Sequence, residues 1–167
     1  YNKLLKIDAK SKIHEKNVLV TNYHGFAYMY LIRMGVKAGI SDLIQKFINT
    51  KPNIAPYDVL IIDEYQDIEL ELAELLKMVK AANPKIQIIA VGDMQQKIYD
   101  KTTLNVSEFI NKFLDDYVLL EFTRCFRLSS ELAARLGRIW NKPIIGVNSE
   151  CRVERMNIDQ VVEFLAQ

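Results

Sequence analysis

Short apolar runs alternate along the chain with longer stretches in which apolar residues recur every three or four positions. The short runs are rich in β-branched residues and predict strands over residues 18–20, 58–62, 88–91, 118–122 and 151–156. The longer stretches predict helices over residues 24–34, 42–49, 68–79, 109–114, 130–140 and 159–166. Ser129 and Ser130 are placed to cap the helix at 130–140. This alternation favours an α/β fold in which helices flank a parallel sheet.

Polar residues follow three of the predicted strands at the point where each strand ends. Asp63 and Glu64 come after residues 58–62, the sequence GDMQQ after residues 88–91, and TRCFR after residues 118–122. A buried carboxylate is costly unless it is compensated, so the fully buried strand predicted at 58–62 must reach a surface at Asp63. In a parallel sheet the three strand ends lie on one edge, which is where open α/β sheets bind ligands.

An acid pair, a glutamine and an arginine at one edge suit the hydrolysis of a magnesium–nucleotide complex. One carboxylate can hold Mg²⁺ through its water ligands, and a second can take the proton from the attacking water. Amide and guanidinium groups can contact the γ-phosphate. The sequence therefore favours a nucleotide site at the edge where these strands end.

Four segments of the chain together resemble one known family. LIIDEYQD, IIAVGDMQQKIY and LEFTRCFR are similar to motifs II, III and IV of superfamily 1 helicases of the UvrD/Rep/PcrA type. VTNYHGFAYMYLIR resembles motif Ib of that family, although Asn22-Tyr23 stands where Thr-Phe is usual. The resemblance spans residues 20–127 and keeps the family's order. It implies a RecA-like parallel sheet, which is the core of P-loop NTPases. It also implies an enzyme that couples Mg-ATP hydrolysis to movement on a single strand, and it favours DNA over RNA as that strand.

Matched by position, the resemblance assigns the residues of an ATP site. Asp63 would hold Mg²⁺ through water, and Glu64 would be the general base of hydrolysis. Gln66 would belong to the nucleotide site and link it to the rest of the motor. Gln96, the glutamine of the GDxxQ pattern, would sense the γ-phosphate.

The same resemblance assigns two further pairs of residues. Phe126 would stack on the adenine, and Arg127 would contact the γ-phosphate. His24 and Tyr99 would lie on the side that binds single-stranded DNA, where aromatic faces stack on bases without sequence preference.

The chain lacks two parts of the family's ATP site. No G-x-x-x-x-G-K-S/T phosphate loop occurs in the 167 residues, and motifs V and VI are absent. The family places the phosphate loop upstream of motif Ib, and the chain begins at Tyr1. We therefore expect an internal segment of a helicase, lacking its first strand and phosphate loop and inactive alone. Residues 1–142 would be a partial first RecA-like domain, and residues 143–167 a linker and the start of the second.

Composition indicates the cellular compartment more than the function. The net charge of +1 gives no general argument for nucleic acid or membrane, and no apolar run approaches membrane-spanning length. The two cysteines, Cys125 and Cys151, have no metal-ligand spacing, which favours free thiols in a reducing, cytoplasmic setting.

Two other classes of protein stay open. A two-carboxylate metal-dependent hydrolase, such as a nuclease or phosphatase, would need further acids or histidines at the metal, and Asp93 is the only good extra candidate. A non-catalytic nucleic-acid-binding relic would need no intact ATP site.

Overall fold

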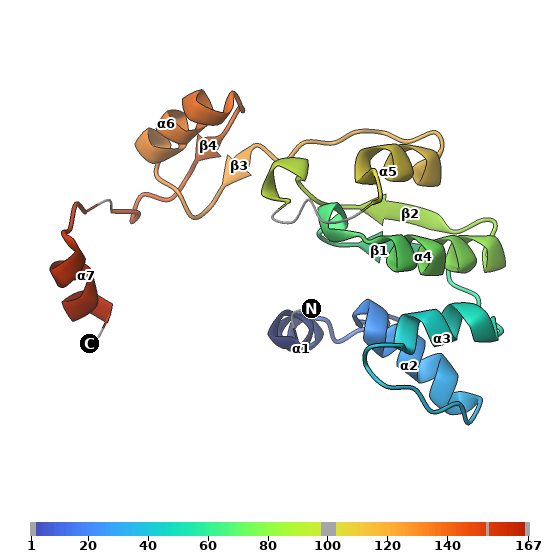
Figure 1. The fold of residues 1–167 in the computed structure, drawn as a ribbon. Coiled ribbons are helices and arrows are strands. Elements are labelled where there is room, and N and C mark those ends of the chain that lie inside the picture. The colour runs from blue at the N-terminus through green and yellow to red at the C-terminus, as the bar shows by residue number, and fades with distance from the viewer. Residues whose placement is uncertain (1–2, 98–102, 153, 166–167) are drawn as a thin grey trace. The chain divides into compact units, whose positions relative to one another are not determined.

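The computed structural model describes residues 3–97, 103–152 and 154–165 (Figure 1). The chain divides into two compact units, one up to Tyr117 and one from Val118 onward, and each is described by itself. Among the described residues, no helix is both long and apolar enough to cross a membrane.

The described part of the first unit contains five α-helices, two strands and two single-turn 3₁₀ helices. Its elements are α1 (Lys3–Lys12), α2 (Tyr23–Arg33), α3 (Leu43–Thr50), β1 (Val59–Ile62), the single-turn 3₁₀ helix η1 (Tyr65–Asp67), α4 (Leu70–Ala82), β2 (Gln87–Ala90), the 3₁₀ helix η2 (Met94–Gln96) and α5 (Val106–Leu114). The predictions of α2 to α5 and of both strands are confirmed. The sequence analysis missed α1, whose largely polar sequence has no clear apolar stripe.

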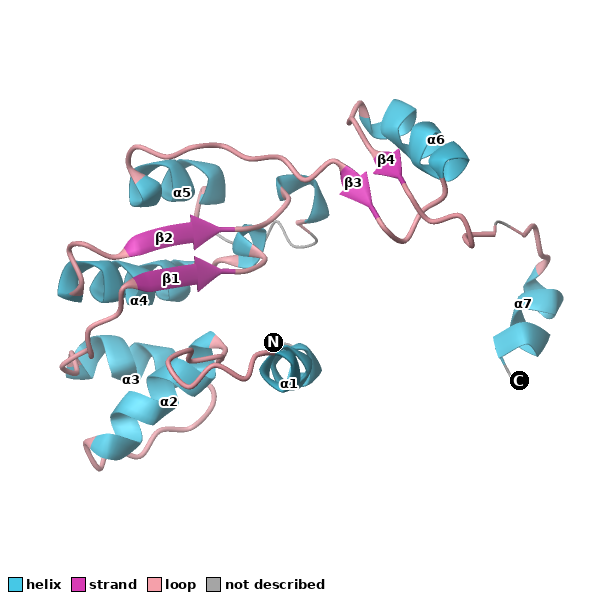
Figure 2. Cartoon of the chain, turned by 180° about the vertical axis from the view of Figure 1, so that it is seen from behind, coloured by secondary structure: helices cyan, strands magenta, loops and turns pink. Residues whose placement is uncertain are grey.

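β1 and β2 form a parallel pair, and Figure 2 shows both arrows pointing the same way. Val59 lies opposite Gln87, and Ile62 lies opposite Ala90. The pairing continues past the strands, because Val91 N donates to the carbonyl oxygen of Ile62 at 2.8 Å. The prediction that these two strands are parallel and end at one edge is therefore confirmed.

The two faces of this small sheet differ in burial. One face carries Leu60, Ile62 and Ile88, which pack into the hydrophobic core with the helices. On the other face, Val59 and Ile61 are exposed, Ile61 to 66%. The prediction of a fully buried strand is thus wrong for one face, because no described element of the first unit covers it.

Two hydrophobic clusters hold the first unit together, and α4 contributes to both. The first cluster joins α2, α3 and α4 through Ala27, Leu31, Leu43, Ile44, Phe47, Leu75 and Val79, among others. The second joins β1, α4 and α5 through Ile62, Ile68, Ala73, Leu76, Val106, Phe109, Ile110 and Phe113. Tyr23, Leu60 and Leu72 pack against both clusters. Burial on two sides of α4 therefore fixes the sheet and the helices relative to one another.

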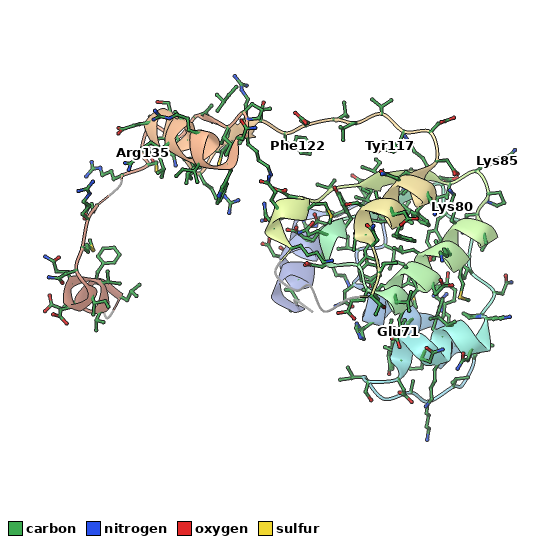
Figure 3. The ribbon with its side chains drawn as sticks, turned by 45° about the horizontal axis from the view of Figure 1, so that its top comes forward. Glu71, Lys80, Lys85, Tyr117, Phe122 and Arg135 are labelled. Atoms are coloured by element: carbon green, nitrogen blue, oxygen red, sulfur yellow. The ribbon has the colours of Figure 1, made fainter. Side chains whose placement is uncertain are left out.

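Lys80, labelled in Figure 3, joins the carboxyl ends of α4 and α5. Its Nζ donates to the carbonyl oxygen of Phe113 at 2.6 Å and to Asp115 Oδ2 at 2.7 Å. A cation at these helix ends also opposes the partial negative charge of the unpaired carbonyl groups. This contact fixes the chain shortly before the first unit ends at Tyr117.

The second unit is a short strand–helix–strand element followed by a separate helix. It contains β3 (Arg124–Cys125), α6 (Ser130–Trp140), β4 (Ile145–Gly146) and α7 (Ile158–Leu165). β3 and β4 are parallel, and α6 connects them. As predicted, Ser129 caps α6: its Oγ accepts a hydrogen bond from Leu132 N at 3.3 Å. The helix predicted near 159–166 is present as α7.

Three predicted strands are absent from the described residues. Residues 18–20, 118–122 and the described members of 151–156 form no strand, and residue 153 lies outside the description. Val118 and Leu120 are largely exposed. A β-rich composition cannot form a strand unless a second backbone accepts and donates the ladder hydrogen bonds, and none lies beside these segments within the described part of their units.

Two isoleucines test the burial of the second cluster. Ile68 is 1% exposed and Ile61 is 66% exposed, so the same truncation removes very different contacts. We expect Ile68→Ala to lower the free energy of unfolding by about 2–5 kcal/mol and Ile61→Ala to lower it far less. Urea unfolding followed by circular dichroism measures both. Equal losses would contradict this description of the core.

Candidate functional site

The site begins where β1 ends. Asp63 and Glu64 are both exposed. Asp63 Oδ1 accepts a hydrogen bond from Glu64 N at 3.1 Å. Glu64 has φ 53° and ψ 48°, the left-handed conformation that residues with a β-carbon rarely adopt. This residue turns the chain from β1 into η1 and sets the direction in which the acidic side chain leaves the sheet.

Gln66 connects the two loops that follow β1 and β2. Its side-chain Nε2 donates to Glu64 Oε2 at 2.6 Å, and its Oε1 accepts from Asp93 N at 3.0 Å. The residue is 3% exposed, and a buried amide of this kind must be hydrogen-bonded to be tolerated. The Gln66 amide therefore joins the end of β1 to the end of β2.

Gly92 allows these loops to approach closely. A methyl group at this position would lie 2.7 Å from Tyr65 Cδ1 and 2.9 Å from Tyr65 N, and it would collide with Gln66 Oε1. Tyr65 N also donates to the carbonyl oxygen of Val91 at 3.1 Å. The glycine of the GDMQQ sequence thus leaves the space that the Gln66 amide and the Tyr65 backbone occupy.

Asp93 organises the turn that carries Gln96. Its Oδ1 accepts from Gln95 N at 3.0 Å, so it caps η2, and its Oδ2 lies 3.4 Å from Gln96 Nε2 in a long hydrogen bond. Gln96 is exposed and leaves the same edge of the sheet as Asp63. The structure therefore brings Asp63, Glu64, Gln66 and Gln96 to one edge.

Tyr23 is a member of this site that the sequence analysis missed. It is the first residue of α2, and its ring is partly buried between the two hydrophobic clusters. Burial, with the nearby carboxylates of Asp63 and Asp67, raises the pKa of the Tyr23 phenol to about 12. Its position directly after Asn22, where the motif departs from Thr-Phe, is the only sequence signal that could have identified it.

Asn22 fixes the start of α2 next to Tyr23. Its Oδ1 accepts from Gly25 N at 2.8 Å, which caps the helix. Its Nδ2 is buried and has no hydrogen-bond partner among the described residues. His24, the motif Ib residue predicted to bind DNA, follows in the first turn of α2 and is partly buried.

The structure does not test the roles of three other predicted site residues. Phe126, which is 74% exposed, and Arg127 follow β3 in the second unit, which is described by itself. Tyr99 lies outside the described residues. Their predicted roles therefore stay predictions.

No group of three His, Cys, Asp or Glu side chains close enough to hold a metal ion occurs among the described residues. Mg²⁺ in nucleotide sites is held by one or two carboxylates, water and the phosphates themselves. Asp63, exposed at the strand end, is of the residue type and in the position that such a site uses.

The segment that contains this edge of the sheet matches a known protein family. The sequence model of a family described as an AAA domain matches residues 8–102, more than half of the chain. The matched region is of the P-loop NTPase type and contains α2, both strands of the first sheet, and every residue from Asp63 to Gln96. The chain belongs to this AAA domain family. No curated protein gave a match to the chain.

The raised pKa of Tyr23 predicts a loss of stability in alkali. Below pH 10.0, the ordinary pKa of the phenol, Tyr23 is neutral in both the folded and the unfolded chain. Above that pH the unfolded chain releases the proton first, and this stabilises it relative to the folded chain. We expect the free energy of unfolding to fall, by on the order of 2 kcal/mol, as the pH rises from 10.0 to about 12. Tyr23→Phe should remove this part of the fall.

Urea unfolding on either side of this pH range measures the effect. Tyr28→Phe is the matched control, because Tyr28 lies on the same helix and is exposed. If Tyr23→Phe and Tyr28→Phe lose stability in alkali equally, Tyr23 does not occupy the environment described.

Proposed function

We propose that the chain is part of an ATP-dependent superfamily 1 helicase or translocase of the UvrD/Rep/PcrA type. In this proposal a RecA-like motor couples Mg-ATP hydrolysis to movement on single-stranded DNA in the cytoplasm. The observation that most supports it is the hydrogen-bonded junction of the Asp63-Glu64 loop with the Gly92-Asp93 turn, at the shared edge of parallel strands. No observation favours a two-carboxylate hydrolase or a binding relic.

The residues at this edge divide the chemistry of ATP hydrolysis among them. Asp63 would hold Mg²⁺ through water, and a metal held there would supply positive charge to the phosphates. Glu64 accepts the proton of the attacking water as the water oxygen bonds to the γ-phosphorus, while the bond from that phosphorus to the bridging oxygen breaks and ADP leaves. Gln96 meets the γ-phosphate with its side-chain amide, from the turn that follows β2.

The second unit supplies the other contacts in this proposal. Phe126 stacks on the adenine and Arg127 contacts the γ-phosphate. Residues 1–142 then belong to the first RecA-like domain, and residues 143–167 form the linker and the start of the second. His24 and Tyr99 meet the single strand, which can stack on aromatic faces whatever its sequence.

The 167 residues contain no phosphate loop, which normally supplies backbone donors and a lysine to the β- and γ-phosphates. We therefore expect the isolated chain to show no ATPase activity above background and at most weak affinity for ATP. Phosphate release measured on purified residues 1–167, with and without single-stranded DNA, tests this. Robust turnover that Glu64→Gln abolishes would show that the chain is a complete enzyme.

The full-length protein should depend on Glu64 for hydrolysis. Glu64→Gln keeps the size of the side chain and removes the base, so turnover should fall by roughly 10²–10⁴-fold while ATP still binds. Glu71→Gln is the matched control, since Glu71 is exposed on α4 (Figure 3). Steady-state phosphate release and ATP-binding measurements check both variants. Turnover of Glu64→Gln within a small factor of wild type would remove Glu64 from the mechanism.

A further inference from the structure

We propose that Gln66 is a positioning residue, whose buried amide holds the Glu64 carboxylate in place and ties it to the turn that carries Gln96. It acts on hydrolysis through Glu64 rather than by touching the nucleotide. This inference rests on the proposed function, in which Glu64 is the base and Gln96 meets the γ-phosphate.

The burial of Gln66 argues against direct contact with a ligand. The residue is 3% exposed, whereas Asp63, Glu64 and Gln96 around it are all exposed. Both ends of its amide already bind protein groups, Nε2 to Glu64 and Oε1 to the backbone of Asp93. A nucleotide could reach the amide only if one of these bonds broke.

The chemistry of the two partners fixes the orientation of this amide. An ionised carboxylate only accepts hydrogen bonds, and a backbone N–H only donates. Turning the Gln66 amide around would set its oxygen against Glu64 and its NH₂ group against the N–H of Asp93. The bond at 2.6 Å also has an ionised acceptor, and hydrogen bonds of this kind are the stronger ones. Gln66 can therefore hold the carboxylate of Glu64 in one position.

Glu64 is constrained from two sides by this arrangement. Its left-handed backbone sets where the side chain starts, and Gln66 sets where Oε2 ends. Oε1 accepts no hydrogen bond from the described residues, so its lone pairs can face a water molecule. A general base must lie within hydrogen-bond reach of the water it deprotonates, and a fixed carboxylate meets this requirement without further ordering.

The same amide connects the base to the proposed γ-phosphate sensor. Gln66 Oε1 accepts from the backbone of Asp93, and the side chain of Asp93 caps η2 and bonds Gln96. A shift of Gln96 toward a phosphate would move Asp93, and Asp93 would pull on Gln66. The position of Glu64 therefore depends on the turn after β2, and Gly92 leaves the space that this connection needs.

Gln66→Met tests the inference, because methionine has a similar length and makes neither hydrogen bond. Loss of a residue that orients a metal ligand typically costs about 10–100-fold in metal affinity or activity, and we expect a similar loss where the oriented group is a base. In the full-length protein we expect the kcat for ATP to fall by about that factor, with KM changed less than about threefold. Gln87→Met, on the exposed face of β2, is the matched control and should leave both constants unchanged.

A double-mutant cycle with Glu64→Gln separates positioning from direct binding. If Gln66 acts through Glu64, Gln66→Met lowers kcat in the wild-type background and adds nothing in the Glu64→Gln background. A raised KM, or losses that multiply in the double variant, would overturn the inference. If Glu64→Gln alone leaves turnover intact, the proposed function fails instead, so the two failures are distinguishable.

A second measurement needs no catalysis and uses the 167-residue chain. Gln66→Met should speed hydrogen exchange at the amide of Asp93, which loses its acceptor, and leave the amide of Val91, which donates to Ile62, protected. Gln66→Asn keeps a buried amide but is too short to reach both partners, so it should also speed exchange at the amide of Asp93. This variant replaces Gln66→Met in the test if the methionine variant does not fold. Unchanged exchange at Asp93 in both variants would overturn the inference.

Discussion

The parallel hydrogen bonding of β1 to β2 is the constraint on which the site depends. Because the two strands run the same way and Ile62 lies opposite Ala90, the loops that follow them leave one edge together. An antiparallel pair would put the acidic loop and the Asp93 turn at opposite ends of the sheet. α4 and α5 cover one face of the pair, so the strand ends are held by a packed core. The core fixes where the strands end, and Gln66 then positions the side chain of Glu64.

The sequence predicted most of the helices and the one strand pair of the first unit because the signals for them are local. Apolar spacing in α4 and α5 depends on which face of each helix is buried, and the sequence carries that information directly. The strand predicted at residues 118–122 failed for the opposite reason. Its composition suits a strand, but pairing requires a backbone neighbour that no local pattern supplies. The same limit explains the exposed face of β1, because the continuous apolar run over residues 59–62 predicts burial on both faces.

For the candidate site, motif order identified the residue types at the strand ends, and the structure places Asp63, Glu64 and Gln96 on the shared edge. Motif order did not indicate that Gln66 is buried or which groups its amide binds, because burial and hydrogen-bond partners are properties of the folded chain. Tyr23 was missed for the same reason: it lies near the carboxylates of Asp63 and Asp67 because the folded chain packs it against both hydrophobic clusters. The roles of Phe126 and Arg127 stay predictions.

The contact between Gly92 and Gln66 has a consequence for how this protein can evolve. A side chain at position 92 would occupy the space of the Gln66 oxygen, and a shorter residue at position 66 would leave the amide of Asp93 without its acceptor. Neither position can change alone without cost. A lineage that replaced this junction would have to pass through an impaired intermediate, or acquire both changes at once. The two positions thus form a linked pair under selection, although 25 residues separate them in the chain.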